Sequence, residues 1–165
     1  MAFTHRAGWR PPEGSVLKST GSGGRYGALA VRFSGPDQKD LQQEYFTSRT
    51  EFAGTDRGSV PTLFNHGEPV DSAPIFKRFA DRFFPNAQLK RLNNGIFAEV
   101  QLDPADKFQS ALADLIEAGA LRWSSGSTNQ FVRKSIDGGI TRWPIVEVSL
   151  TPSPAEPRLP KLRRM

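Results

Sequence analysis

The sequence contains no cysteine, and among its 165 residues it has only two histidines, His5 and His66. The first absence excludes disulfides and thiolate metal sites, and it indicates a reducing compartment. The scarcity of histidine excludes a His-rich zinc site, so that only a carboxylate site could hold a metal. Asp37, Asp40 and Glu44 are acidic neighbours, but they lack the glycine spacing and ligand density of a calcium loop. We therefore expect neither a metal nor a cofactor.

Long apolar runs are also missing. No stretch approaches the roughly 20 apolar residues that a membrane-spanning helix needs. The first residues, MAFTHRAGWRPPEG, lack the apolar segment of a secretory signal. We expect a soluble protein of intracellular type that has no membrane partner.

The net charge of +5 comes from the two ends of the chain. Residues 1–25 and 156–165 each carry an excess of lysine and arginine, whereas the middle of the chain is close to neutral. Basic ends suit loose contact with nucleic acid or another acidic surface, and they do not form a surface for specific nucleic-acid recognition.

Composition also divides the chain into segments. Residues 1–25 contain PPEG and STGSGG with few apolar residues, which predicts a flexible basic arm. The proline-rich stretch 151–157 cannot continue a strand ladder, so residues 158–165 are predicted to be a basic C-terminal tail. One folded domain is therefore expected over residues 26–157.

Short strands dominate the predicted domain, while the segments 38–46 and 75–84 keep no assigned type. The predicted strands cover 26–33, 60–65, 88–92, 96–102, 120–124, 130–135 and 140–150, the last with a break near Pro144. One helix is predicted from Pro104 to Ala118, with Asp103 as its N-cap and Gly119 as its stop. This pattern predicts a mainly β or α+β fold, a small β-barrel surrounded by a few helices.

The segment GALRWSSGS (119–127) raises the question whether one of its serines is catalytic, because an apolar run ends in Ser124, Ser125, Gly126 and Ser127. A serine becomes a nucleophile at neutral pH only beside a base, and His66 is the only histidine of the predicted domain. An ordinary Ser/Gly turn explains the same residues. The segment does not match the G-x-S-x-G nucleophile elbow either. In that motif a helix follows the serine, whereas here the predicted helix precedes it.

Glu147 lies in the apolar strand PIVEVSL (144–150), where alternation places Ile145, Glu147 and Ser149 on one face. A carboxylate in such surroundings needs a partner. Arg122 or Arg142 could pair with it, or Glu147 could orient an imidazole. The residues alone leave these alternatives open.

Four segments together resemble the prohead maturation proteases of tailed bacteriophages, distant relatives of the herpesvirus assemblin proteases. They are GPDQKDLQQEYF (35–46), LFNHG (63–67), GALRWSSGS (119–127) and WPIVEVSLTPSPAEP (143–157). The resemblance covers residues 26–157, and it implies a serine endopeptidase on an assemblin-like β-barrel.

The resemblance assigns a role to each candidate residue. Ser124 matches the nucleophile, because the family's serine is followed by one residue and then glycine. His66 matches the general base, and Glu147 matches the acidic member that orients it, where the herpesvirus relatives use a second histidine. Ser127 stands where the family often has an aromatic residue, so Ser125 and Ser127 remain alternative nucleophiles.

An oxyanion hole is a further requirement of this chemistry, and backbone N–H groups near Gly126 or after Leu150 are the candidates.

The resemblance also implies partners. The substrates would be a phage scaffold protein or an extension of the major capsid protein, cleaved by a homodimer inside the procapsid in the host cytoplasm. The protease would also cleave itself, with the basic tails as self-cleavage or packaging segments. The chain departs from many members in its extra length between His66 and Gly95 and in lacking a long scaffolding region, which suggests a scaffold on a separate chain.

Two other interpretations compete with the protease. The first is a non-enzymatic β-barrel module that acts in capsid assembly or binds nucleic acid, and the second is a hydrolase of a non-peptide ester.

Overall fold

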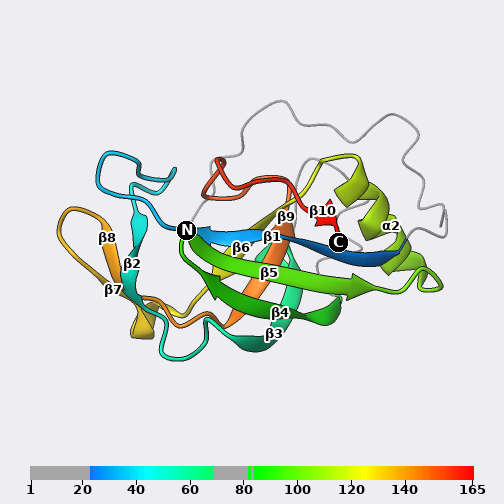
Figure 1. The fold of residues 1–165 in the computed structure, drawn as a ribbon, viewed down its shortest axis with the longest axis horizontal. Helices are drawn as coiled ribbons and strands as arrows, with labels where there is room; N and C mark the ends of the chain where they lie inside the picture. The colour runs from blue at the N-terminus through cyan, green and yellow to red at the C-terminus, as the bar shows by residue number, and fades with distance from the viewer. Residues whose placement is uncertain (1–22, 69–81, 83) are drawn as a thin grey trace.

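A curled sheet with both antiparallel and parallel strand pairs forms the framework of the protein (Figure 1). The computed structural model describes residues 23–68, 82 and 84–165. In spatial order, the main sheet holds β10 (Arg163–Arg164), β1 (Gly24–Arg32), β5 (Gly95–Leu102), β4 (Phe84–Leu92), β3 (Gly58–Phe64), β9 (Glu147–Thr151) and β6 (Arg122–Gly126). A smaller sheet holds β2 (Tyr45–Glu51), β8 (Gly139–Arg142) and β7 (Arg133–Lys134). The prediction of a mainly β fold is confirmed.

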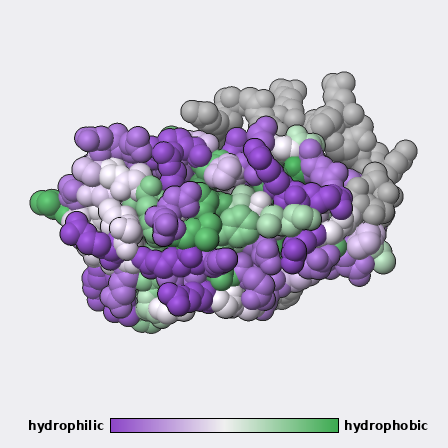
Figure 2. Space-filling view, in the orientation of Figure 1, coloured by the Kyte–Doolittle hydropathy of each residue, from purple (hydrophilic) through white to green (hydrophobic). Residues whose placement is uncertain are grey.

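The main sheet curls into a half-barrel, because β6 at one edge packs against β1 near the other. The core lies inside this curl, where Tyr26, Phe64 and Trp123 are fully buried. Trp123 also donates its indole N–H to the carbonyl of Ala98 at 3.1 Å, which ties β6 across the core to β5. Figure 2 shows hydrophilic side chains over most of the visible face, with a hydrophobic band across its middle.

Most predicted strands are present with shifted ends, including the neighbouring strands 88–92 and 96–102, which pair as β4 and β5. The break near Pro144 separates β8 from β9, as predicted. The segment 130–135 was predicted to be a strand, but only β7 pairs as a strand, because residues 129–131 form a helical turn. Strand β2 was not predicted, since YFTSRTE is polar and lacks a clear apolar alternation.

The single α-helix among the described residues, α2 (Lys107–Glu117), begins later than predicted. Asp103 is not its N-cap, because its carboxylate accepts a hydrogen bond from Ala105 N within a preceding turn. Asp106 caps the helix instead and accepts from Phe108 N and Gln109 N at 2.9 and 2.8 Å. Gly119 ends the helix as predicted, with a left-handed φ of 72°.

The C-terminal residues return to the sheet. β10 pairs with the beginning of β1, and Leu159 and Leu162 are buried. Arg164 contacts Glu117 of α2 and the hydroxyl of Tyr26. Burial and the hydrogen bond that Tyr26 donates to Glu117 raise the pKa of Tyr26 to about 12. Residues 158–165 were predicted to be a tail beyond the domain, but apolar leucines at this spacing pack against it.

Two segments discussed from the sequence lie outside the residues that the structure describes. Residues 1–22 of the predicted arm and nearly all of the segment 75–84 are not among the described residues. In the described part of the chain, no helix has the length and apolar character required to cross a membrane.

Candidate active site

Strand β9 brings the candidate residues together, because it lies between β3 and β6. It runs parallel to β3, whose end leads into His66, and antiparallel to β6, which contains Ser124. Residues that are far apart in the sequence therefore meet on three adjacent strands.

His66 lies in a left-handed turn that directly follows β3. Asn65, His66 and Gly67 have φ values of 49°, 57° and 74°. Glycine adopts this conformation without a steric cost, whereas for asparagine and histidine, although both are enriched there among non-glycine residues, it costs on the order of 1–3 kcal/mol. Contacts from β9 stabilise the turn, since Ser149 Oγ accepts from His66 N at 2.9 Å and Thr151 Oγ1 donates to Asn65 Oδ1 at 2.8 Å.

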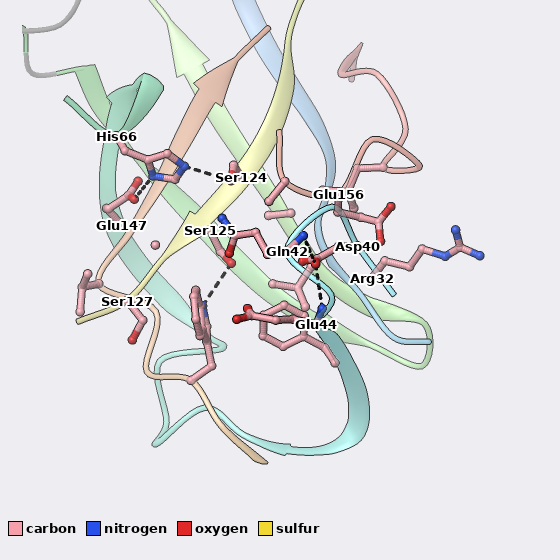
Figure 3. A pocket seen from close by; sticks show the side chains of 18 of the residues that line it. Arg32, Asp40, Gln42, Glu44, His66, Ser124, Ser125, Ser127, Glu147 and Glu156 are labelled. Carbon is pink, nitrogen blue, oxygen red and sulfur yellow. Dashed lines mark hydrogen bonds and ion pairs between the residues drawn. The ribbon is translucent and has the colours of Figure 1, made fainter. Parts of the chain in front are cut away.

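The imidazole of His66 contacts both other members of the predicted triad (Figure 3). Its Nε2 lies 3.0 Å from Ser124 Oγ, and its Nδ1 is hydrogen-bonded to Glu147 Oε1. An ionised carboxylate only accepts hydrogen bonds, so Nδ1 carries the hydrogen and Nε2 is free to accept the serine proton. This is the arrangement that a serine nucleophile, a general base and an orienting acid require.

Cross-strand pairing explains how these side chains fit. Ser124 lies opposite Ser149 and Gly126 lies opposite Glu147, so all four positions share one face of β6 and β9. A Cβ on Gly126 would overlap Glu147 Oε1. The absence of a side chain at Gly126 therefore leaves room for the carboxylate that contacts the imidazole.

Ser125 and Ser127 are engaged elsewhere. Ser125 Oγ accepts a hydrogen bond from the indole of Trp143 at 3.2 Å, and Ser127 donates to the carbonyl of Pro144. Of these three candidate serines, Ser124 is the one whose hydroxyl contacts the imidazole of His66.

The arginines considered as partners of Glu147 have other surroundings. Arg122 donates to the carbonyl of Leu159, and Arg142 Nε is buried without a hydrogen-bond partner among the described residues. Glu147 is itself buried, and it contacts His66 and Ser149 instead.

An open pocket of about 480 Å³ lies beside Ser124, between the main sheet and the smaller sheet (Figure 3). Phe46, Trp143 and Leu159 give it apolar walls, and Asp40 and Glu44 add carboxylates. Burial raises the pKa of Asp40. A substrate in this pocket would place a reacting carbonyl near the serine hydroxyl.

The acidic neighbours that were considered for a metal site serve local structure. Asp40 accepts from the backbone N–H groups of Gln42 and Glu44, and Glu44 pairs with Lys134. Among the described residues, no three histidine, aspartate or glutamate side chains gather so that they could hold a metal ion.

Two residues of the loop after Leu150 cannot serve as the predicted oxyanion donors. Pro152 has no N–H, and Ser153 N donates to Thr151 Oγ1 at 3.1 Å. The other N–H groups of this loop and those near Gly126 stay a prediction.

Ser149 and Thr151 had no role predicted from the sequence. Their signal is visible in EVSLT (147–151), where polar residues alternate with apolar ones in a strand whose five residues are all buried. Buried polar side chains need partners, and here the partners are Glu147 and the turn at His66.

Comparisons of this chain with protein-family models, with curated proteins and with solved structures found no match.

Proposed function

We propose that this protein is a serine hydrolase in which Ser124, His66 and Glu147 act as a catalytic triad. The proposal depends on one observation, the chain of contacts from Ser124 Oγ through both nitrogens of His66 to Glu147. A turn serine without catalytic function would not need a half-buried histidine and a buried carboxylate in line with it.

In the proposed mechanism, Ser124 Oγ attacks the carbonyl carbon of the substrate while His66 Nε2 takes the hydroxyl proton. Glu147 keeps the hydrogen on Nδ1 and stabilises the imidazolium that forms. The imidazolium then gives its proton to the leaving group, which departs and leaves an acyl group on Ser124. Water, deprotonated by the same imidazole, attacks this ester and releases the acid and the free serine.

We further propose that the substrate is a peptide bond, and that the protein is a prohead maturation endopeptidase with an assemblin-like fold. The four sequence segments described above support this assignment, and the mainly β half-barrel is compatible with it. The proposed substrates are a phage scaffold protein, the major capsid protein and the chain itself, within an assembling procapsid. A homodimer is part of the same proposal.

The test is co-expression of the chain with the capsid and scaffold proteins of its phage, with intact mass as the readout. We expect cleavage by the wild type, and a loss of at least about 10³-fold in rate for Ser124→Ala. Ser110→Ala is the matched control, because Ser110 is a fully buried serine whose hydroxyl has no partner among the described residues. Equal cleavage by Ser124→Ala and wild type would exclude Ser124 as the nucleophile.

A second readout separates the competing interpretations. A fluorophosphonate probe should label wild type and not Ser124→Ala if the protein is a serine hydrolase of either kind. Labelling without cleavage of any peptide would favour the ester hydrolase. If the protein is not labelled and cleaves no peptide, but binds nucleic acid or capsid protein in a salt-sensitive manner, the non-enzymatic module is favoured.

A further inference from the structure

Ser149 contacts both the acid and the base of the proposed triad. We infer that Ser149 is a positioning residue, which fixes the carboxylate of Glu147 and the backbone of His66 so that the imidazole points at Ser124. This inference rests on the proposed function, because it concerns the geometry that the proposed reaction needs.

The first contact holds the carboxylate. Ser149 Oγ donates to Glu147 Oε2 at 2.7 Å, while Oε1 of the same carboxylate accepts from His66 Nδ1. With both oxygens engaged, the carboxylate has one orientation. On the β6 side, Gly126 offers no side chain to hold it, so Ser149 supplies the side-chain contact that fixes its rotation.

The second contact holds the base. The backbone N–H of His66 donates to Ser149 Oγ at 2.9 Å, and it does so from a residue with a φ of 57°. The left-handed backbone at His66 directs the imidazole back toward β9 and β6. Ser149 therefore stabilises the conformation that places the ring between Glu147 and Ser124.

Burial makes these two contacts hard to replace. Ser149 has no exposed surface, so water does not reach its hydroxyl from solvent. Its single hydroxyl hydrogen is used by Glu147 and its oxygen accepts from His66 N, which leaves it no part in proton transfer at Ser124. Ser149 acts through its neighbours and does not touch the reacting atoms.

The test compares Ser149→Ala with wild type and with Ser110→Ala in hydrolysis of a p-nitrophenyl ester. We expect kcat to fall about 10²-fold for Ser149→Ala with KM changed less than about twofold, because the base is misplaced and the pocket is intact. Ser110→Ala should change neither quantity.

A proton NMR measurement supplies a readout that does not depend on turnover. The hydrogen on His66 Nδ1 should give a low-field signal in wild type and in Ser110→Ala, and Ser149→Ala should lose it through faster exchange with water. Because the chain has only two histidines, His66→Gln assigns the signal. If Ser149→Ala does not fold by thermal melting, Ser149→Cys, of similar size and a weaker donor, takes its place.

The outcomes separate this inference from the proposed function. A wild type without ester turnover or probe labelling would refute the function, and the NMR comparison alone would then decide the role of Ser149. An unchanged low-field signal and an unchanged kcat in Ser149→Ala would overturn the inference, whatever the substrate is.

Discussion

At the scale of single residues, Gly126 determines how the side chains of β6 and β9 fit together. Its missing side chain creates the space in which the carboxylate of Glu147 lies, and the two residues are direct cross-strand partners. The glycine has no left-handed φ, so its role is to make room and not to bend the chain.

We expect Gly126→Ala to displace Glu147 and to lower the rate of fluorophosphonate labelling by about 10²-fold or more, since the base loses its orienting acid. Stopped-flow or gel-based labelling would measure this rate. Gly35→Ala is the control, because a Cβ at Gly35 meets no atom within 4 Å and its backbone is not left-handed. Labelling of Gly126→Ala at the wild-type rate would show that the position of Glu147 does not govern the reactivity of Ser124.

The sequence allowed His66, Ser124 and Glu147 to be named as candidates, but an ordinary turn explained Ser124 and an arginine partner explained Glu147 equally well, so that their roles came from the resemblance to a family. Their meeting could not be derived from the residues alone. It depends on β9 lying between β3 and β6, and strand order is a long-range property that no local pattern encodes. The left-handed φ of His66 could not be predicted either, because even the residue types enriched at positive φ, histidine among them, adopt it in a minority of cases.

At the scale of elements, the two aspartates before α2 show why boundaries are hard to predict. Asp103 and Asp106 are both good N-cap residues in sequence, and Pro104 favours the first helical position after Asp103. The structure starts the helix three residues later, where the carboxylate of Asp106 reaches two backbone N–H groups. The helix and its end at Gly119 were predictable, whereas the choice between two caps was not.

We expect Asp106→Ala to lower the free energy of unfolding by about 1 kcal/mol, because two N–H groups of the first turn lose their acceptor. Denaturant unfolding followed by circular dichroism measures this change. Asp103→Ala is the matched comparison, and it should cost less than about 0.5 kcal/mol, as exposed substitutions outside caps do. A larger cost for Asp103→Ala than for Asp106→Ala would contradict the assignment of the cap.

At the scale of the whole molecule, the last residues close the fold. β10 adds to the free edge of β1, and Arg164 links this strand to α2 through Glu117. The basic composition of residues 158–165 predicts a tail. Composition takes no account of position, however, and Leu159 and Leu162 are spaced so that both are buried.

We expect a chain that ends at Pro157 to be strongly destabilised. Exposing two buried leucines costs roughly 3–6 kcal/mol, which is a large part of the 5–15 kcal/mol by which a domain is typically stable. Thermal melting of the truncated chain would measure the loss, with Met165→Ala as the control because Met165 is 58% exposed. A melting temperature equal to that of the full chain would show that the segment contributes nothing to the fold.

The position of β9 between β3 and β6 also has a consequence in time. During synthesis, His66 and Ser124 leave the ribosome well before Glu147 and Ser149, so a nascent chain holds an imidazole and a serine that nothing yet brings together. We expect the proposed hydrolase to stay inert until β9 has entered the sheet. For the proposed endopeptidase, this order predicts that newly made polypeptides nearby, this chain included, are not cleaved before β9 is in place.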